Sequence, residues 1–274
     1  LFKDEKNQKV ILKIWYFILL LVLIDAFKEI ITGTNFIGYG GLYGNRILSF
    51  FKDEPVLAAF LNAFIFIISG YLMTNFKDKN NLNKLLSILS IILFITCVVF
   101  TGERSNTLKL FAGILIFCSI NKYFKTKNKV NFILIISIVT LFAINSSDYL
   151  KLRYYSQIKN LFIGAGGQEH LYFNLYKSGY EVFKKYPFFG VGNKNYRIET
   201  CDIKKINENK NYSCSTHPHQ IYFEFLSEHG LFGTLILLFL FYKIVFSKIF
   251  IVVKEANYIQ IGSLIFLITT FLPM

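Results

Sequence analysis

Four long uncharged runs dominate this sequence and limit what it can fold into. Three of them, residues 56–73, 85–102 and 130–147, are 18 residues long, and the fourth, residues 258–274, is 17 residues long. A helix rises 1.5 Å per residue, so about 20 residues cross the hydrocarbon core of a bilayer. The runs therefore predict transmembrane helices. They exclude a soluble enzyme, a disordered tail and a disulfide-rich secreted module.

Three weaker apolar segments bring the expected number of spans to about seven. They cover residues 11–31, 107–121 and 230–250. The first is interrupted by Lys13, Asp25 and Lys28, which we expect to reach the headgroups from near the helix ends. We predict an all-α polytopic membrane protein. Because the chain starts without Met and stops within an apolar run, we also expect it to be a piece of a longer protein.

Lysines between the spans predict the orientation of the chain. The net charge is +13, from 30 basic and 17 acidic residues. The loop at 121–129 holds four lysines and no acid, so the positive-inside rule places it in the cytoplasm. This clustering accounts for the charge better than nucleic-acid binding does. Alternation of the spans then places residues 32–55, 101–106 and 148–225 on the outer face.

This orientation divides the chain into three parts. Residues 1–147 are predicted to hold five transmembrane helices with short loops, and residues 226–274 the last two, the final one truncated. Residues 148–225 form an outer loop that is too long for a passive connection, and we expect it to carry the active site. Within it, apolar residues spaced three and four apart predict an amphipathic helix at 168–185, lying along the headgroups.

All four arginines fall on the predicted outer face, whereas lysine divides between the two faces. A guanidinium group is a planar fork that holds phosphate or carboxylate through two hydrogen bonds, which an ammonium group cannot do. The arginines are therefore candidate ligands for an anionic substrate, with anchoring at the outer interface as the alternative. They are Arg46, Arg104, Arg153 and Arg197.

Cysteine usage predicts one disulfide. Cys201 and Cys214 are the two cysteines of the outer loop, which would face an oxidising compartment. A bridge between them would stiffen the segment leading to His217. Cys97 and Cys118 lie in apolar spans, where a packing role is expected.

The sharpest chemical signal is the string STHPHQ at 215–220. We expect Thr216 or His217 to cap a helix whose first turn begins at Pro218 and includes His219. The field at a helix N-terminus favours an anion and keeps a histidine neutral, so His219 would be a general base beside a phosphate. Three alternatives stay open. They are a metal site that lacks evident further ligands, a Ser or Cys nucleophile that lacks an orienting acid, and plain surface histidines.

Four motifs in the middle and second half of the chain occur in a fixed order. They are TGERS at 101–105, Arg153, YPFFGVGN at 186–193, and HPHQIY at 217–222, the last followed by Leu226, Glu228, Gly230 and Gly233. Over about residues 90–240 these motifs resemble the bacterial O-antigen ligase and O-antigen polymerase superfamily. The chain departs from that family at Gln220, where Asn is usual, and in lacking an obvious arginine before the amphipathic helix.

The resemblance implies a GT-C-like glycosyltransferase of the bacterial inner membrane, inverting and independent of metals and other cofactors. It implies transfer of an O-antigen glycan from undecaprenyl diphosphate to a sugar hydroxyl of lipid A core on the periplasmic face. Membrane lipids are the other expected partners. The catalytic residues would be His219, Arg104 and Arg153. The substrate-binding residues would be Arg197, His217, Gln220 and Arg46.

Other functions stay open. A polymerase would join repeat units, and a protein-glycosylating ligase would use the same chemistry on another acceptor. A non-catalytic transporter of polysaccharide lipids would also expose arginines and aromatic residues, but it is expected to contain symmetric halves, and no internal repeat is evident. A plain membrane anchor is disfavoured by the length and histidine content of the outer loop.

Overall fold

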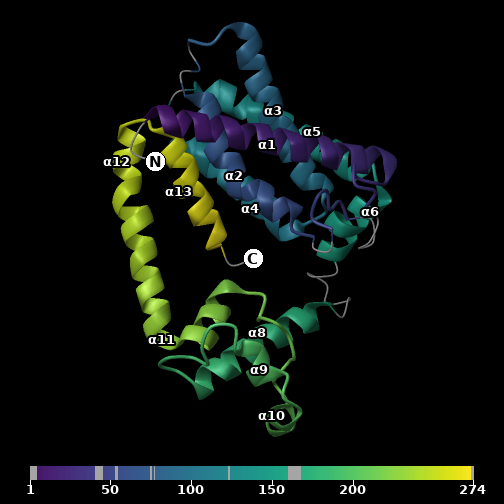
Figure 1. Cartoon of the computed structure of the whole chain (residues 1–274), viewed down its shortest axis with the longest axis vertical. Coiled ribbons are helices and arrows are strands. Elements are labelled where there is room, and N and C mark those ends of the chain that lie inside the picture. Colours follow the sequence, from purple (N-terminus) through teal and green to yellow (C-terminus); the bar gives the residue numbers. More distant parts are fainter. Residues whose placement is uncertain are drawn as a thin grey trace. The chain divides into compact units, whose positions relative to one another are not determined.

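The chain is all-helical in this computed structural model, which describes residues 5–40, 46–52, 55–74, 76, 78–122, 124–159 and 168–272. Within those ranges no residue belongs to a β-strand. The chain forms two compact units (Figure 1). The first comprises Leu1–Ser156 and Ile249–Thr270, and the second comprises Gln157–Lys248 and Phe271–Met274.

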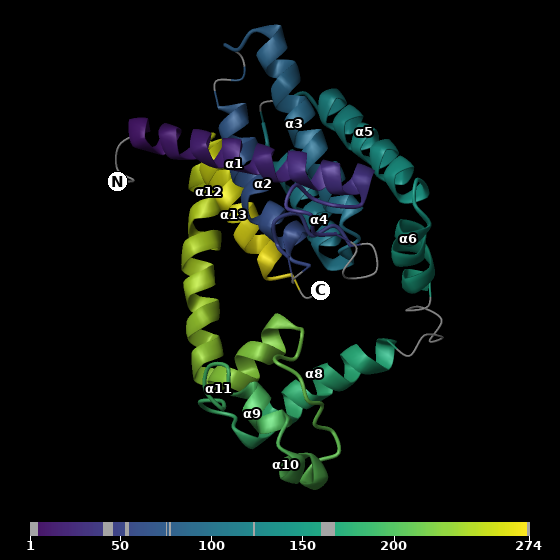
Figure 2. The same cartoon turned by 45° about the vertical axis from the view of Figure 1, so that its right-hand side comes forward.

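Long helices coincide with the apolar segments of the sequence. The first unit contains α1 (Glu5–Thr32), α2 (Leu57–Met73), α3 (Asn81–Phe100), α4 (Arg104–Ile120), α5 (Thr126–Asn145) and α13 (Tyr258–Thr270) (Figures 1 and 2). From the second unit, α11 (Ile221–Phe241) continues through η2 (Tyr242–Phe246) into α12 (Ser247–Lys254). In the described part of the chain, α1, α3, α5 and the continuous α11–α12 stretch are long and apolar enough to cross a membrane. Shorter apolar helices are α2 and α13. The prediction of an all-α polytopic membrane protein is confirmed.

Helix α2 packs closely against two neighbours through glycines. A side-chain carbon added at Gly70 of α2 would lie 2.1 Å from the Tyr258 carbonyl oxygen of α13, and one at Gly262 of α13 would lie 2.1 Å from the Phe66 carbonyl oxygen. A carbon added at Gly113 of α4 would lie 2.1 Å from the Phe66 ring. Small residues let helix backbones approach in this way where lipid gives no hydrophobic drive for association.

Two buried carboxylates of α1 hold the loop that follows this helix. Asp25 accepts hydrogen bonds from the Phe36 backbone N–H (2.8 Å) and from the Ser49 hydroxyl (2.6 Å). Glu29 accepts hydrogen bonds from the backbone N–H groups of Leu48 and Ser49. The expectation that Asp25 reaches the headgroups is wrong, because its side chain is fully buried and pairs with loop donors that need acceptors.

The second unit is built on the amphipathic helix that the sequence predicts. This helix is α8 (Gln168–Lys185), and two short helices follow it, α9 (Tyr196–Thr200) and α10 (Ile203–Glu208). On α8, Leu175 is buried and Val182 packs with Tyr196 and Tyr212 in a buried cluster. The bounds of α8 match the prediction. Tyr172, Phe173 and Tyr180 of the same helix are exposed, and the expectation that α8 lies along the headgroups stays a prediction.

A turn at residues 187–192 is joined to α11 by backbone hydrogen bonds, and we call this joint the seam. Two N–H groups of the turn donate to α11, from Val191 to the Ser227 carbonyl (3.0 Å) and from Gly192 to the Glu228 carbonyl (2.8 Å). Two N–H groups of α11 donate to the turn, from Leu231 to the Pro187 carbonyl (2.8 Å) and from Phe232 to the Phe188 carbonyl (3.2 Å). These bonds form where α11 kinks at Gly230, whose φ of 61° and ψ of −166° are not helical. The seam therefore replaces helical hydrogen bonds that the kink interrupts.

Two glycines make the seam close enough to form. A side-chain carbon at Gly190, which has a φ of 68°, would lie 2.3 Å from the Glu228 carbonyl carbon. One at Gly230 would lie 2.4 Å from the Phe188 carbonyl group. Both positions combine a left-handed backbone with direct contact between two main chains, so only glycine fits them.

A non-glycine residue in such a backbone conformation usually costs about 1–3 kcal/mol. We expect Gly230→Ala to destabilise the full-length protein by more than this amount, because its added carbon would also clash with Phe188. Thermal unfolding in detergent measures the effect. Gly33→Ala is the matched control, because Gly33 also has a positive φ (78°) but no described atom lies within 4 Å of its added carbon. Equal destabilisation by the two substitutions would contradict a steric role for the seam.

Candidate active site

The predicted histidine string, residues 215–220, forms a loop in the second unit directly before α11. Gln220 is the N-cap of α11, and its side-chain oxygen accepts a hydrogen bond from the Phe223 backbone N–H at 2.9 Å. The predicted helix start at Pro218, capped by Thr216 or His217, is wrong. The amide oxygen of Gln220 supplies the cap instead, so the helix begins three residues later than expected.

His219 lies outside the helix, in a left-handed backbone conformation with a φ of 57°. Its ring centroid is 4.1 Å from that of His217 and 6.2 Å from that of Tyr172 on α8, which it meets edge to face. Thr216 Oγ1 lies 2.9 Å from His217 Nδ1. His219 is exposed. The two histidines thus form a pair that is open to a substrate and adjoins an aromatic ring of α8.

The surroundings of His219 favour its neutral form. Partial burial of the ring lowers the pKa of His219 from its ordinary value, and the neighbouring His217 lowers it further. Glu224 acts in the opposite direction, and the net effect is a lowered pKa. A neutral imidazole can accept a proton, so His219 has the protonation state that a general base needs.

Ser178 of α8 ties the segment before the histidine loop to the rest of the second unit. Its buried hydroxyl oxygen accepts hydrogen bonds from the Tyr196 hydroxyl (2.8 Å) and from the Ser213 backbone N–H (3.1 Å). A disulfide joins Cys201, which follows α9, to Cys214, which precedes the loop. These links restrain the chain on the N-terminal side of the histidines.

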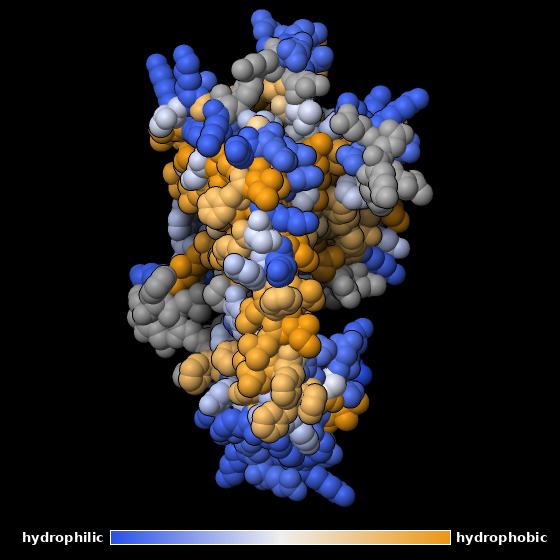
Figure 3. Space-filling view, turned by 90° about the vertical axis from the view of Figure 1, so that its left-hand side faces the viewer, coloured by the Kyte–Doolittle hydropathy of each residue, from blue (hydrophilic) through white to orange (hydrophobic). Residues whose placement is uncertain are grey.

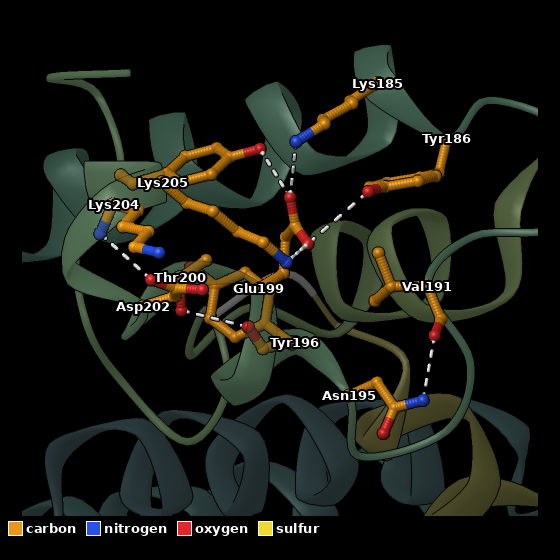
Figure 4. Close-up of polar contacts among 11 residues, drawn as sticks. Lys185, Tyr186, Val191, Asn195, Tyr196, Glu199, Thr200, Asp202, Lys204 and Lys205 are labelled. Carbon is orange, nitrogen blue, oxygen red and sulfur yellow. Dashed lines mark hydrogen bonds and ion pairs between the residues drawn. The ribbon is translucent and has the colours of Figure 1, made fainter. Parts of the chain in front are cut away.

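A buried carboxylate, Glu199 of α9, accepts hydrogen bonds from donors in three parts of the second unit (Figure 4). Lys185 Nζ lies 2.8 Å and Lys205 Nζ 2.5 Å from its oxygens, and the hydroxyls of Tyr186 and Tyr212 donate at 3.4 and 3.3 Å. Burial acts to raise the pKa of Glu199, but the hydrogen bonds from the two lysines outweigh it and hold the pKa below its ordinary value. Burial and the Glu199 carboxylate raise the pKa of Tyr212 to about 12. Glu199 therefore stays ionised and links α8, α9 and α10.

In the first unit, a second carboxylate lies beside two of the predicted arginines. Glu103, the residue before α4, accepts hydrogen bonds from the Ala58 backbone N–H (3.1 Å) and the Asn106 side chain (2.6 Å). Burial raises the pKa of Glu103, and the charges of Arg46 and Arg153 oppose that shift. Both guanidinium groups are therefore close enough to Glu103 to act on its charge.

Arg153 is positioned by a short turn of π-helix. After α6 (Asp148–Lys151), η1 (Leu152–Ser156) brings Arg153 Nε to 3.1 Å from the Gly102 carbonyl oxygen. The next residue, Tyr154, donates to the Val99 carbonyl (3.0 Å), and its hydroxyl lies 2.8 Å from that of Thr107. The turn thus fixes Arg153 against the end of α3, next to the TGERS motif.

A cavity of about 330 Å³ lies within the first unit. Its lining includes Arg46, Glu29 and Tyr149, together with Phe100 of α3. The buried Tyr149 hydroxyl has no hydrogen-bond partner among the described residues. The cavity therefore offers a cation and an aromatic hydroxyl to an anionic or hydroxyl-bearing ligand.

The predicted site residues fall into two sets, one in each unit. The first set lies around Glu103. The charges of Arg46 and Arg153 act on its carboxylate, and half-buried Arg104 is the next residue in the sequence. The second set holds His217, His219 and Gln220 in one loop, the cysteine pair that flanks it, and Arg197, which is exposed on α9. Among the described residues no group of three or more His, Cys, Asp or Glu is placed to hold a metal ion.

Sequence reasoning missed Glu103, Tyr149, Glu199 and Glu224. Glu103 is part of the TGERS motif, and its position next to Arg104 is the sequence feature that could have identified it as a site residue. Nothing in the sequence marks Glu199, because its donors come from positions up to 14 residues away on other elements.

Comparison with known proteins gives one match. A family model described as O-antigen ligase matches residues 89–238, more than half of the chain. No curated protein and no solved structure matches the chain. The matched segment contains TGERS, Arg153, the seam and the histidine loop.

Proposed function

We propose that this chain, which belongs to the O-antigen ligase family, transfers an undecaprenyl-diphosphate-linked O-antigen glycan to a sugar hydroxyl of lipid A core. The observation that carries the chemistry is His219, which is exposed on a fixed loop and has a lowered pKa. Family membership supports the class of donor and acceptor. Lipid A core as the acceptor is our choice between ligase and polymerase.

In the proposed reaction the acceptor hydroxyl oxygen attacks the anomeric carbon of the donor glycan. A new C–O bond forms, the bond from that carbon to the pyrophosphate oxygen breaks, and His219 takes the hydroxyl proton. Attack opposite to the leaving group inverts the anomeric centre. Undecaprenyl diphosphate leaves as a stabilised anion, so the protein needs to neutralise charge and to orient the acceptor. This scheme uses no metal.

Arginines are proposed to neutralise the pyrophosphate, with Arg104 and Arg153 in catalytic roles and Arg46 and Arg197 in binding roles. The hydrogen bond from Arg153 to the Gly102 carbonyl supports this, because it fixes a guanidinium beside the TGERS motif. Arg46 is supported by its place in the wall of the 330 Å³ cavity. His217 and Gln220 are proposed to contact the substrate from the histidine loop.

We also propose that the histidine loop faces the periplasm from the inner membrane. Support comes from lysines that flank the opposite ends of the spans, above all at 121–129. The disulfide between Cys201 and Cys214 also fits an oxidising compartment.

A reconstitution assay tests the proposal. Purified full-length protein is given undecaprenyl-diphosphate glycan with either lipid A core or a second repeat-unit lipid as acceptor. We expect glycan on lipid A core and none on the repeat-unit lipid. Chain extension of the repeat-unit lipid would make the protein a polymerase. If folded, membrane-inserted protein forms neither product, both transferase functions are refuted.

If the arginines clamp pyrophosphate through a bidentate fork, charge alone will not replace them. We expect Arg104→Lys and Arg153→Lys each to lower kcat/KM by about tenfold or more at equal expression. The control is Lys151→Arg, which changes an exposed residue on α6 that pairs with Asp148, and it should leave activity unchanged. Wild-type activity in both Arg→Lys variants would reduce these arginines to membrane anchors.

The pH dependence of kcat/KM should report the titration of His219. A base works when deprotonated, so activity should fall as the pH drops through the pKa of His219, below the ordinary value of 6.5. His217→Gln removes a cause that lowers this pKa and should move the acidic limb to higher pH. Glu224→Gln removes a cause that raises it and should move the limb to lower pH. His219→Ala should lose about 10²–10⁴-fold in turnover. An acidic limb that stays in place in both neighbour variants would show that another group is the base.

A further inference from the structure

Two adjacent phenylalanines in the seam turn are highly exposed. The side chains of Phe188 and Phe189 are 59% and 76% exposed, although the turn that carries them is fixed by four backbone hydrogen bonds. Transfer of apolar ring surface from water into an apolar environment is favourable. The two rings are therefore suited to an apolar environment outside the protein.

The pair extends the apolar surface of α11. The Phe189 ring stacks on that of Phe232 at a centroid distance of 5.4 Å, and the Phe188 ring lies 6.2 Å from it. Figure 3 shows this apolar surface along α11 and the hydrophilic side chains at its end. Exposed apolar residues of α11 continue the surface at Leu231, Phe232, Leu235, Ile236 and Phe239.

The seam fixes the depth of the pair relative to α11. Because Leu231 and Phe232 donate to the carbonyls of Pro187 and Phe188, the turn cannot shift along the helix without losing those bonds. Phe232 lies 11 residues before Lys243 and 16 before Lys248, which corresponds to about 17 and 24 Å along a helix. The hydrocarbon core is about 30 Å thick and lysines reach out of it, so Phe232 lies in the half of the core opposite to these lysines.

The sequence of α11 changes at the same point. Glu224, Glu228 and His229 precede Leu231, and the next ionisable side chain apart from tyrosine is that of Lys243. The turn therefore meets α11 at the start of its apolar stretch.

We propose that Phe188 and Phe189 insert into the lipid bilayer at this point and anchor the histidine-bearing segment to the membrane surface. Leu175 and Val182 of α8 do not serve this purpose, because they are buried inside the second unit. The seam turn supplies a membrane contact that is fixed to α11 by backbone hydrogen bonds. It sets the distance between the bilayer and the loop that carries His219, independently of which glycan reaction occurs there.

Ile203 has the same exposure in a different setting. Its side chain is also 76% exposed, but it lies on α10 among charged neighbours, Lys204, Lys205 and Glu208. It is a matched control for Phe189, with equal exposure and a different setting.

Tryptophan fluorescence in bilayers tests the proposal without requiring activity. In full-length protein with Trp15 and any other tryptophan replaced by Phe, single tryptophans are introduced by Phe189→Trp, Phe232→Trp and Ile203→Trp. We expect lipids brominated along the acyl chain to quench tryptophan at positions 189 and 232 and to leave position 203 unquenched. Phe232→Trp shows that the bilayer quencher reaches α11.

Two results would overturn the inference. Quenching at 232 without quenching at 189 would place the turn in water. Blue-shifted but unquenched emission at 189 that depends on the protein-to-lipid ratio would show that a second copy of the chain covers the pair. A single environment at 189 and a formed Cys201–Cys214 bridge under non-reducing conditions confirm that the variants are folded.

Discussion

In a bilayer, backbone groups cannot hydrogen-bond to water, so each must find a partner within the protein. This constraint explains why the apolar runs are helical, and buried backbone groups inside the protein have the same need for partners. At the Gly230 kink the carbonyls of Ser227 and Glu228 receive N–H groups from the turn, and the N–H groups of Leu231 and Phe232 reach carbonyls of the same turn. The backbone groups at the kink therefore find partners 36 to 44 residues earlier in the sequence, and that earlier segment is fixed in place as a result.

Buried carboxylates perform a related task outside the helices. Asp25 and Glu29 pair with donors of the loop after α1, and Glu103 pairs with the N–H at the start of α2. In the second unit, Glu199 gathers lysines and tyrosines from three elements. Each acid organises a connection between helices, and Glu103 does so beside the proposed arginine clamp.

The histidine loop shows how a correct expectation can rest on a wrong cause. We expected a neutral His219 because of the field at a helix N-terminus, but His219 is not part of the helix. Its pKa is lowered instead by partial burial and by His217. The different origin changes the experiment, because substitution of His217 becomes a test of electrostatics and no longer one of helix capping.

What the sequence alone determined is local or statistical. Apolar segments located the long helices, of which α1, α3, α5 and α11–α12 are long enough to cross a membrane. Spacing of apolar residues gave the bounds of α8, and ordered motifs indicated the family that residues 89–238 match. These signals are readable because hydrophobic length and helical period depend only on neighbouring residues. The start of α11, the burial of Asp25, the Glu199 cluster and the seam were decided by the tertiary structure. Each depends on hydrogen bonds between residues distant in sequence or on competition between caps, and a pattern in one chain does not encode which partner a polar group will find.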